Sequence, residues 1–318
     1  MNRNRITFLF AGLVVLLAAV SIPARADREI EKTLKLDPGG RFVLDADAGS
    51  VTITGTSEAG AKVIITSNRD DLASLFNFNF EDGPGTARVT ARKTFHDFWL
   101  KNLSLHFEIR VPTTTQLELK TGGGSIKVYG IKGDSDLKTS GGSVNVSDLA
   151  GRLNVATSGG GISLREVTGD ARVGTSGGSI EVASLSGSLH GNTSGGPIHI
   201  SRVEGDVDAE TSGGSIHIEG AGGRVIAKTS GGSIEVSFDR GNAKGGELET
   251  SGGSVHAALD PRVNLTVDAS ASGGGVRSDL PISRVGRVST SSLRGSLGSG
   301  GAELRMHTSG GSIQIAAR

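Results

Sequence analysis

Cysteine is absent from the chain, and this absence excludes several kinds of protein together. A chain without cysteine forms no disulfide, holds no metal through thiolates and has no thiol nucleophile. Its folded state must therefore be stabilised by hydrophobic packing and by hydrogen bonds along the backbone.

The sequence also lacks an excess of charge of either sign, with 33 lysines and arginines against 33 aspartates and glutamates. Proteins that bind nucleic acids usually carry a basic surplus, so we expect no nucleic-acid partner. Proline is scarce, with 7 residues, whereas glycine contributes 50. Because the glycines recur at regular intervals, they indicate turns of a repeating fold rather than a disordered chain.

Long hydrophobic runs are missing apart from one near the N-terminus. Residues 6–20 form an apolar run behind two arginines, and the small-residue pattern Ala24-Arg25-Ala26 follows it. This order is typical of a cleaved signal peptide over residues 1–26, and the run is shorter than the roughly 20 residues that span a bilayer. An uncleaved anchor is the alternative. We expect an exported protein, periplasmic or extracellular, that is not stably inserted in a membrane after cleavage.

What the sequence does contain is an internal repeat. Seven threonines stand at an unbroken spacing of 18 residues, and each opens a near-copy of Thr-Ser-Gly-Gly-Ser-Ile: Thr121, Thr139, Thr157, Thr175, Thr193, Thr211 and Thr229. Less regular copies begin at Ala48, Thr250, Ser272 and Thr308. A fixed short period indicates a repeat architecture, and it constrains the fold before any single residue is considered.

Each repeat contains two stretches in which apolar and polar residues alternate. Ile126 and Val128 flank Lys127 in the first stretch, and Leu137 leads to Thr139 in the second. Alternation in β-branched residues is typical of a strand with one buried face. The same phase places the threonines inward, where their hydroxyls can bind backbone groups at the Ser-Gly-Gly corner.

Two strands and two glycine corners per repeat fit one coil of a β-solenoid. We therefore predict an all-β fold, a right-handed parallel β-solenoid resembling a β-helix, with coils of 18 residues. The alternative, a meander of antiparallel hairpins, would leave the apolar columns exposed to water. Residues 27–318 should form one continuous domain, with a capping region over 27–112 and the repeats over 113–318.

Aromatic residues are few, and most lie between residues 68 and 112, outside the regular repeats. The alternating stretch 76–80 predicts a strand. The aromatics of this region either cap the N-terminal end of the solenoid or bind a ligand or partner: Phe76, Phe78, Phe80, Phe95, Phe98, Trp99 and Phe107. Capping is the simpler interpretation, because the end of a solenoid otherwise exposes strand edges.

The stretch from Ile109 through Val111-Pro112 to Leu117 and Ile126, followed by tandem Thr-Ser-Gly-Gly-Ser-Ile motifs, resembles a known family. It is a bacterial β-strand-repeat family of unknown function whose members often carry the label "putative adhesin". The resemblance covers about residues 40–318. It implies an exported β-solenoid, and it brings no catalytic or binding residues with it.

Two groups of side chains are candidates for a site. His199 and His217 share an outward column with Glu181, Glu235 and His256, which could bind a divalent metal or form a solvated polar face. The acidic residues are scattered among columns and alternate with arginines: Asp134, Asp170, Asp206 and Glu210, with Arg152 and Arg224. This alternation indicates charge balance between coils rather than the paired acids of a polysaccharide-cleaving enzyme. We assign no catalytic, cofactor or metal residue.

The sequence as a whole predicts a non-enzymatic exported scaffold that is adhesin-like or interacts with the cell envelope. Its expected partners are envelope components, a polysaccharide or another protein, bound through outward columns or through the aromatic region. One alternative is a polysaccharide-active β-helix enzyme with an acid pair assembled by a loop such as Ser237–Gly246. Another is a self-assembling envelope module whose solenoid ends stack on one another.

Overall fold

The computed structural model describes residues 29–83, 85–94, 103–285 and 289–318. The predicted signal peptide and the aromatic residues Phe95, Phe98 and Trp99 lie outside the described residues. Within the described part the chain is almost entirely β-structure, with one short helix, α1 (Leu72–Leu75). No helix in that part is both long and apolar enough to cross a membrane.

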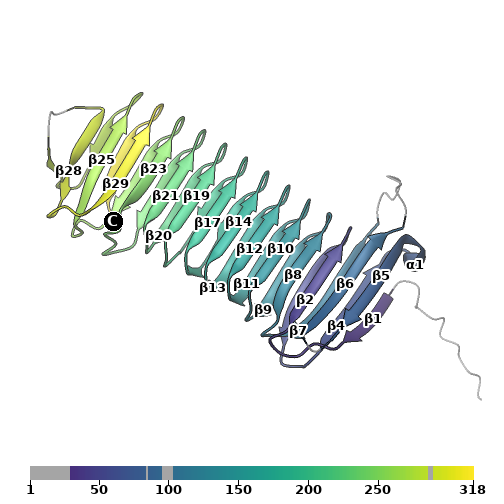
Figure 1. Ribbon diagram of the computed structural model, residues 1–318. Coiled ribbons are helices and arrows are strands. Elements are labelled where there is room, and N and C mark those ends of the chain that lie inside the picture. Colours follow the sequence, from purple (N-terminus) through teal and green to yellow (C-terminus); the bar gives the residue numbers. More distant parts are fainter. Residues whose placement is uncertain (1–28, 84, 95–102, 286–288) are drawn as a thin grey trace, which may run out of the picture.

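The strands form two long sheets with the hydrophobic core between them (Figure 1). Sheet A has the spatial order β1 (Glu29–Leu34), β4 (Ala61–Ser67), β7 (Leu105–Pro112), β3 (Ser50–Thr56), β9 (Ile126–Ile131), β11 (Val144–Ala150), β13 (Ile162–Thr168), β15 (Ile180–Val182), β18 (Ile198–Ile200), β20 (Ile216–Ala221), β22 (Ile234–Phe238), β24 (Val255–Leu259), β30 (Ile313–Ala317) and β26 (Val276–Ser278), with β16 (Leu185–Ser186) also paired to β13.

Sheet B has the spatial order β27 (Ser283–Arg284), β28 (Ser292–Leu297), β25 (Leu265–Ala271), β29 (Ala302–Thr308), β23 (Gly246–Thr250), β21 (Val225–Thr229), β19 (Val207–Thr211), β17 (Leu189–Thr193), β14 (Ala171–Thr175), β12 (Leu153–Thr157), β10 (Ser135–Thr139), β8 (Gln116–Thr121), β2 (Arg41–Ala46), β6 (Thr86–Lys93) and β5 (Phe76–Asp82).

Neighbouring strands of the central array pair in parallel, and paired residues are one repeat apart in sequence. Leu153 pairs with Ala171 in sheet B, and Ile162 pairs with Ile180 in sheet A. Like positions of successive repeats therefore stack into columns that run along the molecule. The predicted all-β fold with parallel strands in two sheets is confirmed, and the alternative of an antiparallel hairpin meander is wrong.

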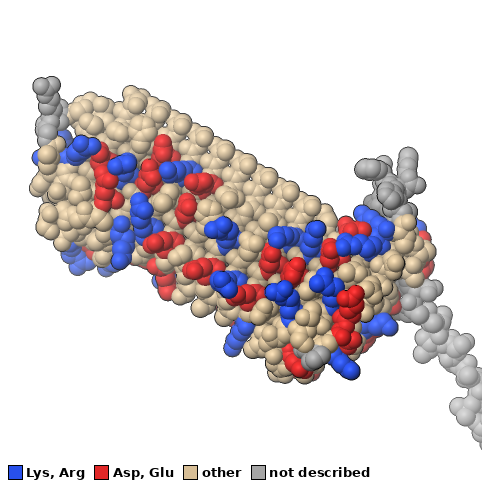
Figure 2. Space-filling model, viewed as in Figure 1, with Lys and Arg blue, Asp and Glu red and all other residues tan. Residues whose placement is uncertain are grey.

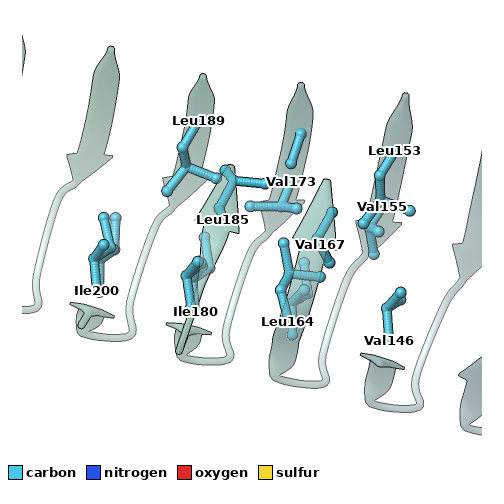
Figure 3. Packing of buried hydrophobic residues seen from close by; sticks show 14 of the residues in the cluster. Val146, Leu153, Val155, Leu164, Val167, Val173, Ile180, Leu185, Leu189 and Ile200 are labelled. Atoms are coloured by element: carbon cyan, nitrogen blue, oxygen red, sulfur yellow. The ribbon is translucent and has the colours of Figure 1, made fainter. Parts of the chain in front are cut away.

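The inward columns fill the space between the sheets with aliphatic side chains (Figure 3). Val155, Leu164 and Val173 come from three strands in both sheets, and each is at most 1% exposed. Complete burial of one such side chain stabilises the folded chain by roughly 1.5–3 kcal/mol. Because the columns repeat in every coil, this contribution is spread evenly along the array.

The repeat threonines point inward, as the alternation predicted, and join each coil to the coil before it. The hydroxyl of Thr193 donates a hydrogen bond to the carbonyl oxygen of Gly178 at 2.9 Å, and it accepts one from the amide of Gly196 at 3.3 Å. The same inter-coil bond is made by nine threonines: Thr121, Thr139, Thr157, Thr175, Thr193, Thr211, Thr229, Thr250 and Thr308. We call this column the threonine ladder.

The two glycines of each Ser-Gly-Gly corner differ in what the fold demands of them. A Cβ atom on Gly178 would lie 2.1 Å from the carbonyl oxygen of Gly160 in the neighbouring coil, so no side chain fits there. A Cβ atom on Gly177 would meet its nearest neighbour, the carbonyl oxygen of Gly159, at 3.6 Å, which is ordinary contact. Its φ is not in the left-handed region either. At this corner only the second glycine is sterically required.

Spatial order departs from chain order at the N-terminal end. The coil of β2 and β3 lies between the coil of β6 and β7 and the coil of β8 and β9. Strands β1, β4 and β5 then close this end by antiparallel pairing. The degenerate repeat copy at Ala48 is therefore covered by chain that comes later in the sequence.

The described aromatic residues pack on the core at this end. Phe76 and Phe107 are at most 1% exposed, while Phe78 and Phe80 are partly buried against the same cluster. The rings follow one another along β5, with centroids 5.8 Å apart for Phe76 and Phe78 and 6.5 Å apart for Phe78 and Phe80. This packing agrees with the capping interpretation for the four aromatics that the structure describes.

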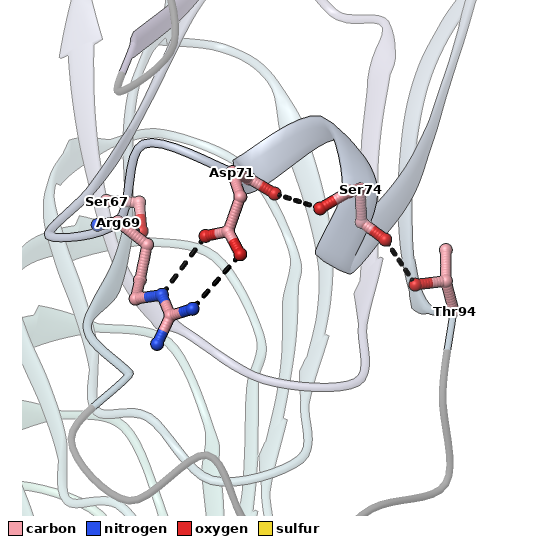
Figure 4. A network of polar contacts seen from close by, with 5 residues as sticks. All are labelled: Ser67, Arg69, Asp71, Ser74 and Thr94. Atoms are coloured by element: carbon pink, nitrogen blue, oxygen red, sulfur yellow. Dashed lines mark hydrogen bonds and ion pairs between the residues drawn. The ribbon is translucent and has the colours of Figure 1, made fainter.

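A polar network ties helix α1 to the end of β6 (Figure 4). The guanidinium of Arg69 donates two hydrogen bonds of 3.0 Å to the carboxylate of Asp71, just before the helix. Ser74 donates to the carbonyl oxygen of Asp71 at 2.7 Å, and Thr94 donates to the carbonyl oxygen of Ser74 at 2.6 Å. These short-range bonds fix the helix over the end of the solenoid.

The C-terminal end repeats the same departure from chain order. The coil of β29 and β30, last in the sequence, lies between the coil of β23 and β24 and the coil of β25 and β26. The outermost strands here are short, with three residues in β26 and two in β27. Short edge strands limit pairing with another chain, so this end is poorly suited to the predicted alternative of end-to-end stacking.

We expect alanine to have opposite effects at the two corner glycines. Gly177→Ala should leave the free energy of unfolding unchanged or raise it by about 0.4–1 kcal/mol, because alanine restricts the unfolded chain. Gly178→Ala should lower it by at least about 2 kcal/mol, since the neighbouring backbone must move. Urea unfolding of both variants measures the difference, and equal effects would contradict the assignment.

We also expect the threonine hydroxyl to be needed within the ladder. Thr193→Val should lower the free energy of unfolding by about 1–3 kcal/mol, because the carbonyl of Gly178 loses its buried donor. Thr193→Ser keeps the hydroxyl and should cost less, about 0.8 kcal/mol for one buried methyl group. Thermal and urea unfolding of the two variants give the order, and a valine variant as stable as the serine variant would refute it.

Candidate functional site

A large, open hollow lies on the outer face of sheet B. It has a volume of about 1130 Å³ and extends from Arg41 on β2 to Ile226 on β21. Figure 2 shows acidic and basic side chains mixed along the visible face, with no large area of one sign. We call this feature the sheet B hollow, and two outward columns of side chains line it.

The first column stands at the corner before each sheet B strand, and its carboxylates accept hydrogen bonds from backbone amides. Asp134 accepts a hydrogen bond from the backbone amide of Arg152 at 2.9 Å, and the guanidinium of Arg152 lies 2.9 Å from the same carboxylate. These bonds, the backbone one first, hold the pKa of Asp134 below its usual value. Asp170 and Asp206 likewise accept from the amides of the next coil, at 2.9 and 2.8 Å.

The second column stands two residues further along each repeat, on the sheet B strand itself. It contains the residues best placed to bind a ligand. His190 contacts Asp208 through Nδ1, with 2.9 Å to Oδ2, which leaves Nε2 for another partner. Arg172, one coil earlier, has no ion-pair partner among the residues that the structure describes. The other oxygen of Asp208, Oδ1, is buried and has no hydrogen-bond partner within the described chain. We call Arg172 and His190 the Arg–His pair.

Sequence reasoning missed the Arg–His pair, although its signal was present. Both residues stand at the same outward position of successive repeats, but the sequence analysis did not follow the charges of this column from coil to coil. In that column Asn154 donates to Asp136 at 3.1 Å, so the neighbouring acid is engaged elsewhere. Tracing which charges lack an opposite neighbour one repeat away would have singled out Arg172.

A second, smaller hollow of about 640 Å³ lies near the N-terminal end of sheet B. Arg92 reaches both Asp45 and Asp47 there, with 2.9 Å from its Nη1 to the Oδ1 of Asp47. Hydrogen bonding from Arg92 lowers the pKa of Asp45, and the two carboxylates raise the pKa of Arg92. Four cationic side chains line this hollow against these two carboxylates, so its lining is net positive: Arg92, Lys93, Lys120 and Lys138.

The predicted histidine column is present on the outer face of sheet A. The rings of His199 and His217 are adjacent, with centroids 6.2 Å apart. His217 lies 3.1 Å from Glu235 and 3.3 Å from Glu219, while His256 lies 3.6 Å from Glu235. Glu181 pairs in register with His199. Over the described ranges, no three histidine, aspartate or glutamate side chains gather closely enough to hold a metal ion.

The loop Ser237–Gly246, considered as the source of an acid pair, is held by structural contacts. Asp239 pairs with the guanidinium of Arg318 at 3.2 Å, and the buried side chain of Asn242 donates to two backbone carbonyls. The nearby Asp260 is 4% exposed and is bound by Arg262 and by the amide of Gly241. Hydrogen bonds from Arg262 above all hold the pKa of Asp260 below its usual value.

The sequence can now be compared with known proteins. The family described as Toastrack DUF4097 matches residues 18–220. The chain belongs to this family. The resemblance to a β-repeat family is thereby confirmed at the family level, and the two-sheet parallel architecture is that of a Toastrack protein.

Solved structures similar to this Toastrack chain align with it over most of its length, but their sequence identities and TM-scores are low. A "putative adhesin" from Bacteroides fragilis has 12% identity and a TM-score of 0.36 over 91% of this chain and 98% of that one. A "putative lipid binding protein" from Parabacteroides distasonis has 12% identity and a TM-score of 0.36 over 91% and 97%. A "putative cell adhesion protein" from Clostridium sporogenes has 11% identity and a TM-score of 0.27 over 92% and 100%. No curated protein matches the chain.

The contacts of Asp260 predict how its contribution to stability depends on pH. Its pKa is lowered in the folded Toastrack chain, whereas an unfolded aspartate titrates near 3.9. The contribution is therefore present above about pH 4 and is lost as the pH falls through the folded-state pKa. Asp260→Asn should be less stable than wild type at pH 7, and the difference should shrink between pH 5 and pH 2.

Urea unfolding across this pH range measures the dependence. Asp37→Asn, at an aspartate in an exposed turn, is the control for removing one carboxylate. A difference for Asp260→Asn that stays constant from pH 7 to pH 2 would show that the carboxylate charge does not stabilise the fold.

Proposed function

We propose that the chain is a non-enzymatic exported scaffold, a right-handed solenoid with 18-residue coils, that binds an acidic polysaccharide of the cell envelope. Binding would take place in the sheet B hollow, with the Arg–His pair at its centre. The observation that carries the proposal is the unpaired guanidinium of Arg172 beside an imidazole already oriented by Asp208.

Arg172 is suited to a carboxylate ligand. A guanidinium is always charged in proteins, and its planar fork matches a carboxylate with two parallel hydrogen bonds. In its own column Arg172 stands between Asn154 and His190, neither of which is acidic. On the strand itself, the next outward position is Gly174, and the amide side chain of Asn192 from the next coil lies over it. The guanidinium is therefore free to meet a ligand from solvent.

The shape and lining of the hollow favour an extended polar ligand over a compact one. Sites for small molecules are usually enclosed and lined by apolar and aromatic groups. The sheet B hollow instead crosses eight neighbouring strands, and charged, amide and hydroxyl side chains line it, among them Asn154, Ser188 and Asp206. Because six carboxylates line the hollow beside four arginines, the ligand that suits it is a hydroxyl-rich polymer with a carboxylate placed to meet Arg172.

Binding without cleavage is favoured by how the nearby carboxylates are used. Enzymes that hydrolyse polysaccharides position two carboxyl groups at a set separation around the scissile bond. Asp134, Asp170 and Asp206 each accept a hydrogen bond from the backbone of the next coil. Asp239, in the loop considered earlier, pairs with Arg318. These engaged acids support a binding role rather than the enzymatic alternative.

The proposal predicts saturable binding of polygalacturonate to the purified chain, measured by titration calorimetry at low salt. Arg172→Ala should weaken that binding roughly 10- to 100-fold, as expected when one charge-assisted hydrogen-bonded pair is lost. His190→Ala should weaken it in the same direction. Affinity should also fall as salt is added, because the contact is between opposite charges.

Arg165→Ala is the matched control. Arg165 belongs to the same coil as Arg172, is exposed and lies on sheet A, so its loss removes the same charge from the opposite face. Neutral dextran and polyglutamate serve as control ligands. Equal weakening by Arg165→Ala, or binding of polyglutamate in preference to polygalacturonate, would refute an acidic polysaccharide in the sheet B hollow.

A further inference from the structure

The smaller hollow of sheet B, of about 640 Å³, lies at the carboxyl ends of strands near the N-terminal end of the solenoid. It crosses β6, β2, β8, β10 and β12, which are neighbours in the sheet (Figure 1). Its lining shares no residue with that of the sheet B hollow, which lies nearer the amino ends of the strands. We call it the lysine hollow, after Lys93, Lys120 and Lys138 in its lining.

Two of these lysines stand side by side in the lysine hollow. Lys120 on β8 and Lys138 on β10 are register partners on adjacent parallel strands, and both are exposed. Neighbouring strands are about 4.8 Å apart, and like charges in directly opposed positions destabilise a sheet. The lysine pair therefore weakens the fold unless negative charge compensates both ammonium groups.

The chain itself compensates only one of the two ammonium groups. Asp136 lies 2.8 Å from the Nζ of Lys138. Asp45, the neighbour of Lys120 in the same column, is bound by the guanidinium of Arg92. Lys120 itself forms no ion pair with any residue that the structure describes. One positive charge of the pair is therefore left for a ligand.

The surroundings of the lysine pair provide space and further donors. The next position in the column after Lys138 is Ala156 on β12, which is exposed and carries only a methyl group. Ser140 and Ser158, just beyond the ends of β10 and β12, are exposed and line the same hollow. The lysine hollow thus combines ammonium and hydroxyl donors with one position where a ligand meets no long side chain.

A phosphate group suits these donors better than a carboxylate does. Phosphate carries up to two negative charges and presents several strong acceptor oxygens, so donors on two strands can each reach an oxygen of their own. A planar carboxylate is matched best by the fork of a guanidinium, whereas an ammonium group acts as a point charge. In this hollow the guanidinium of Arg92 is already held by Asp45 and Asp47, so the cations left for a ligand are lysines.

We propose that the lysine hollow is a binding site for a phosphate group, with Lys120 and Lys138 as its principal contacts. Lys93, at the end of β6, adds a third ammonium group to the lining. Soluble phosphate and the headgroup of a lipid offer the same chemistry, and the experiment below separates the two sources. The inference does not depend on polysaccharide binding, because the two hollows share no lining residue.

An NMR titration of the purified chain with inorganic phosphate at low salt tests the proposal. The amide signals of Ser140 and Ser158 should shift and saturate. Lys120→Ala should weaken binding about tenfold, as expected for the loss of one charge-assisted contact, and Lys120→Ala/Lys138→Ala should weaken it further. Without phosphate, Lys120→Ala should unfold at the wild-type temperature or above it, because the contact between like charges is gone. Weaker binding then cannot be attributed to a damaged fold.

Lys127→Ala is the matched control. Lys127 is exposed on β9, in the same coil as Lys120, so its loss removes the same charge from sheet A instead of sheet B. Co-sedimentation with phosphatidylcholine vesicles that contain phosphatidic acid separates the two sources, with pure phosphatidylcholine vesicles as the blank. Vesicle binding that is lost in Lys120→Ala assigns a lipid headgroup, whereas binding of inorganic phosphate without vesicle binding assigns a soluble phosphate.

Two results would overturn the proposal. The first is the absence of both saturable shifts with inorganic phosphate and binding to the vesicles that contain phosphatidic acid. The second is equal weakening by Lys127→Ala and Lys120→Ala, since phosphate would then be attracted by the charge of the whole chain rather than bound in the lysine hollow.

Discussion

The hydrogen bond from each buried threonine hydroxyl to a glycine carbonyl of the neighbouring coil is the constraint on which the rest of the structure depends. It connects the corner of one coil to the corner of the next, so it fixes both the spacing and the register of the array. The accepting carbonyl belongs to the second glycine of the corner, where a side chain would collide with the coil before it. One inward hydroxyl and one absent side chain therefore have to occur together in every repeat. This explains why the motif is conserved within the chain while the outward positions vary.

A fixed register has consequences for the surface. Every outward residue stands beside its equivalents one coil away, so a charge meets another charge, a neutral residue or nothing according to the repeat sequence. Most charges on sheet B find an opposite partner in this way, as Arg152 does with Asp134. Arg172 does not, because its neighbours in the column are an asparagine and a histidine. A regular scaffold thus makes a charge without an opposite neighbour, such as Arg172, visible as a candidate site.

The repeats made much of the fold predictable, because period-two alternation and an unbroken spacing leave few ways to bury the apolar columns. The buried threonines and the corner glycines could be read from the sequence for the same reason. The placement of the terminal coils could not, since strands such as β3 and β29 carry the same motif as their neighbours and alternation alone does not order equivalent coils. The Arg–His pair also escaped, because its distinguishing property is a missing partner one coil away. His199 and His217 were correctly placed side by side, yet adjacency in one column does not create a third ligand for a metal.

The residue at the ladder position nevertheless differs between the coils inside the array and the coils at its ends. Ala46 and Ala91 take the place of threonine in the first two coils of the N-terminal end, and Ala271 does so in the outermost coil of the C-terminal end. A coil without the hydroxyl cannot satisfy the glycine carbonyl of a coil before it, so it loses least where the array ends. Thr121 and Thr308, in contrast, belong to coils that stack directly on an acceptor, Gly49 or Gly253. At the C-terminal end, hydrogen-bond satisfaction therefore accounts for the interleaving, because the coil that can donate lies inside the array and the coil that cannot donate covers it. At the N-terminal end Ala46 and Ala91 both lack the hydroxyl, so the ladder separates these two coils from the array without setting their order.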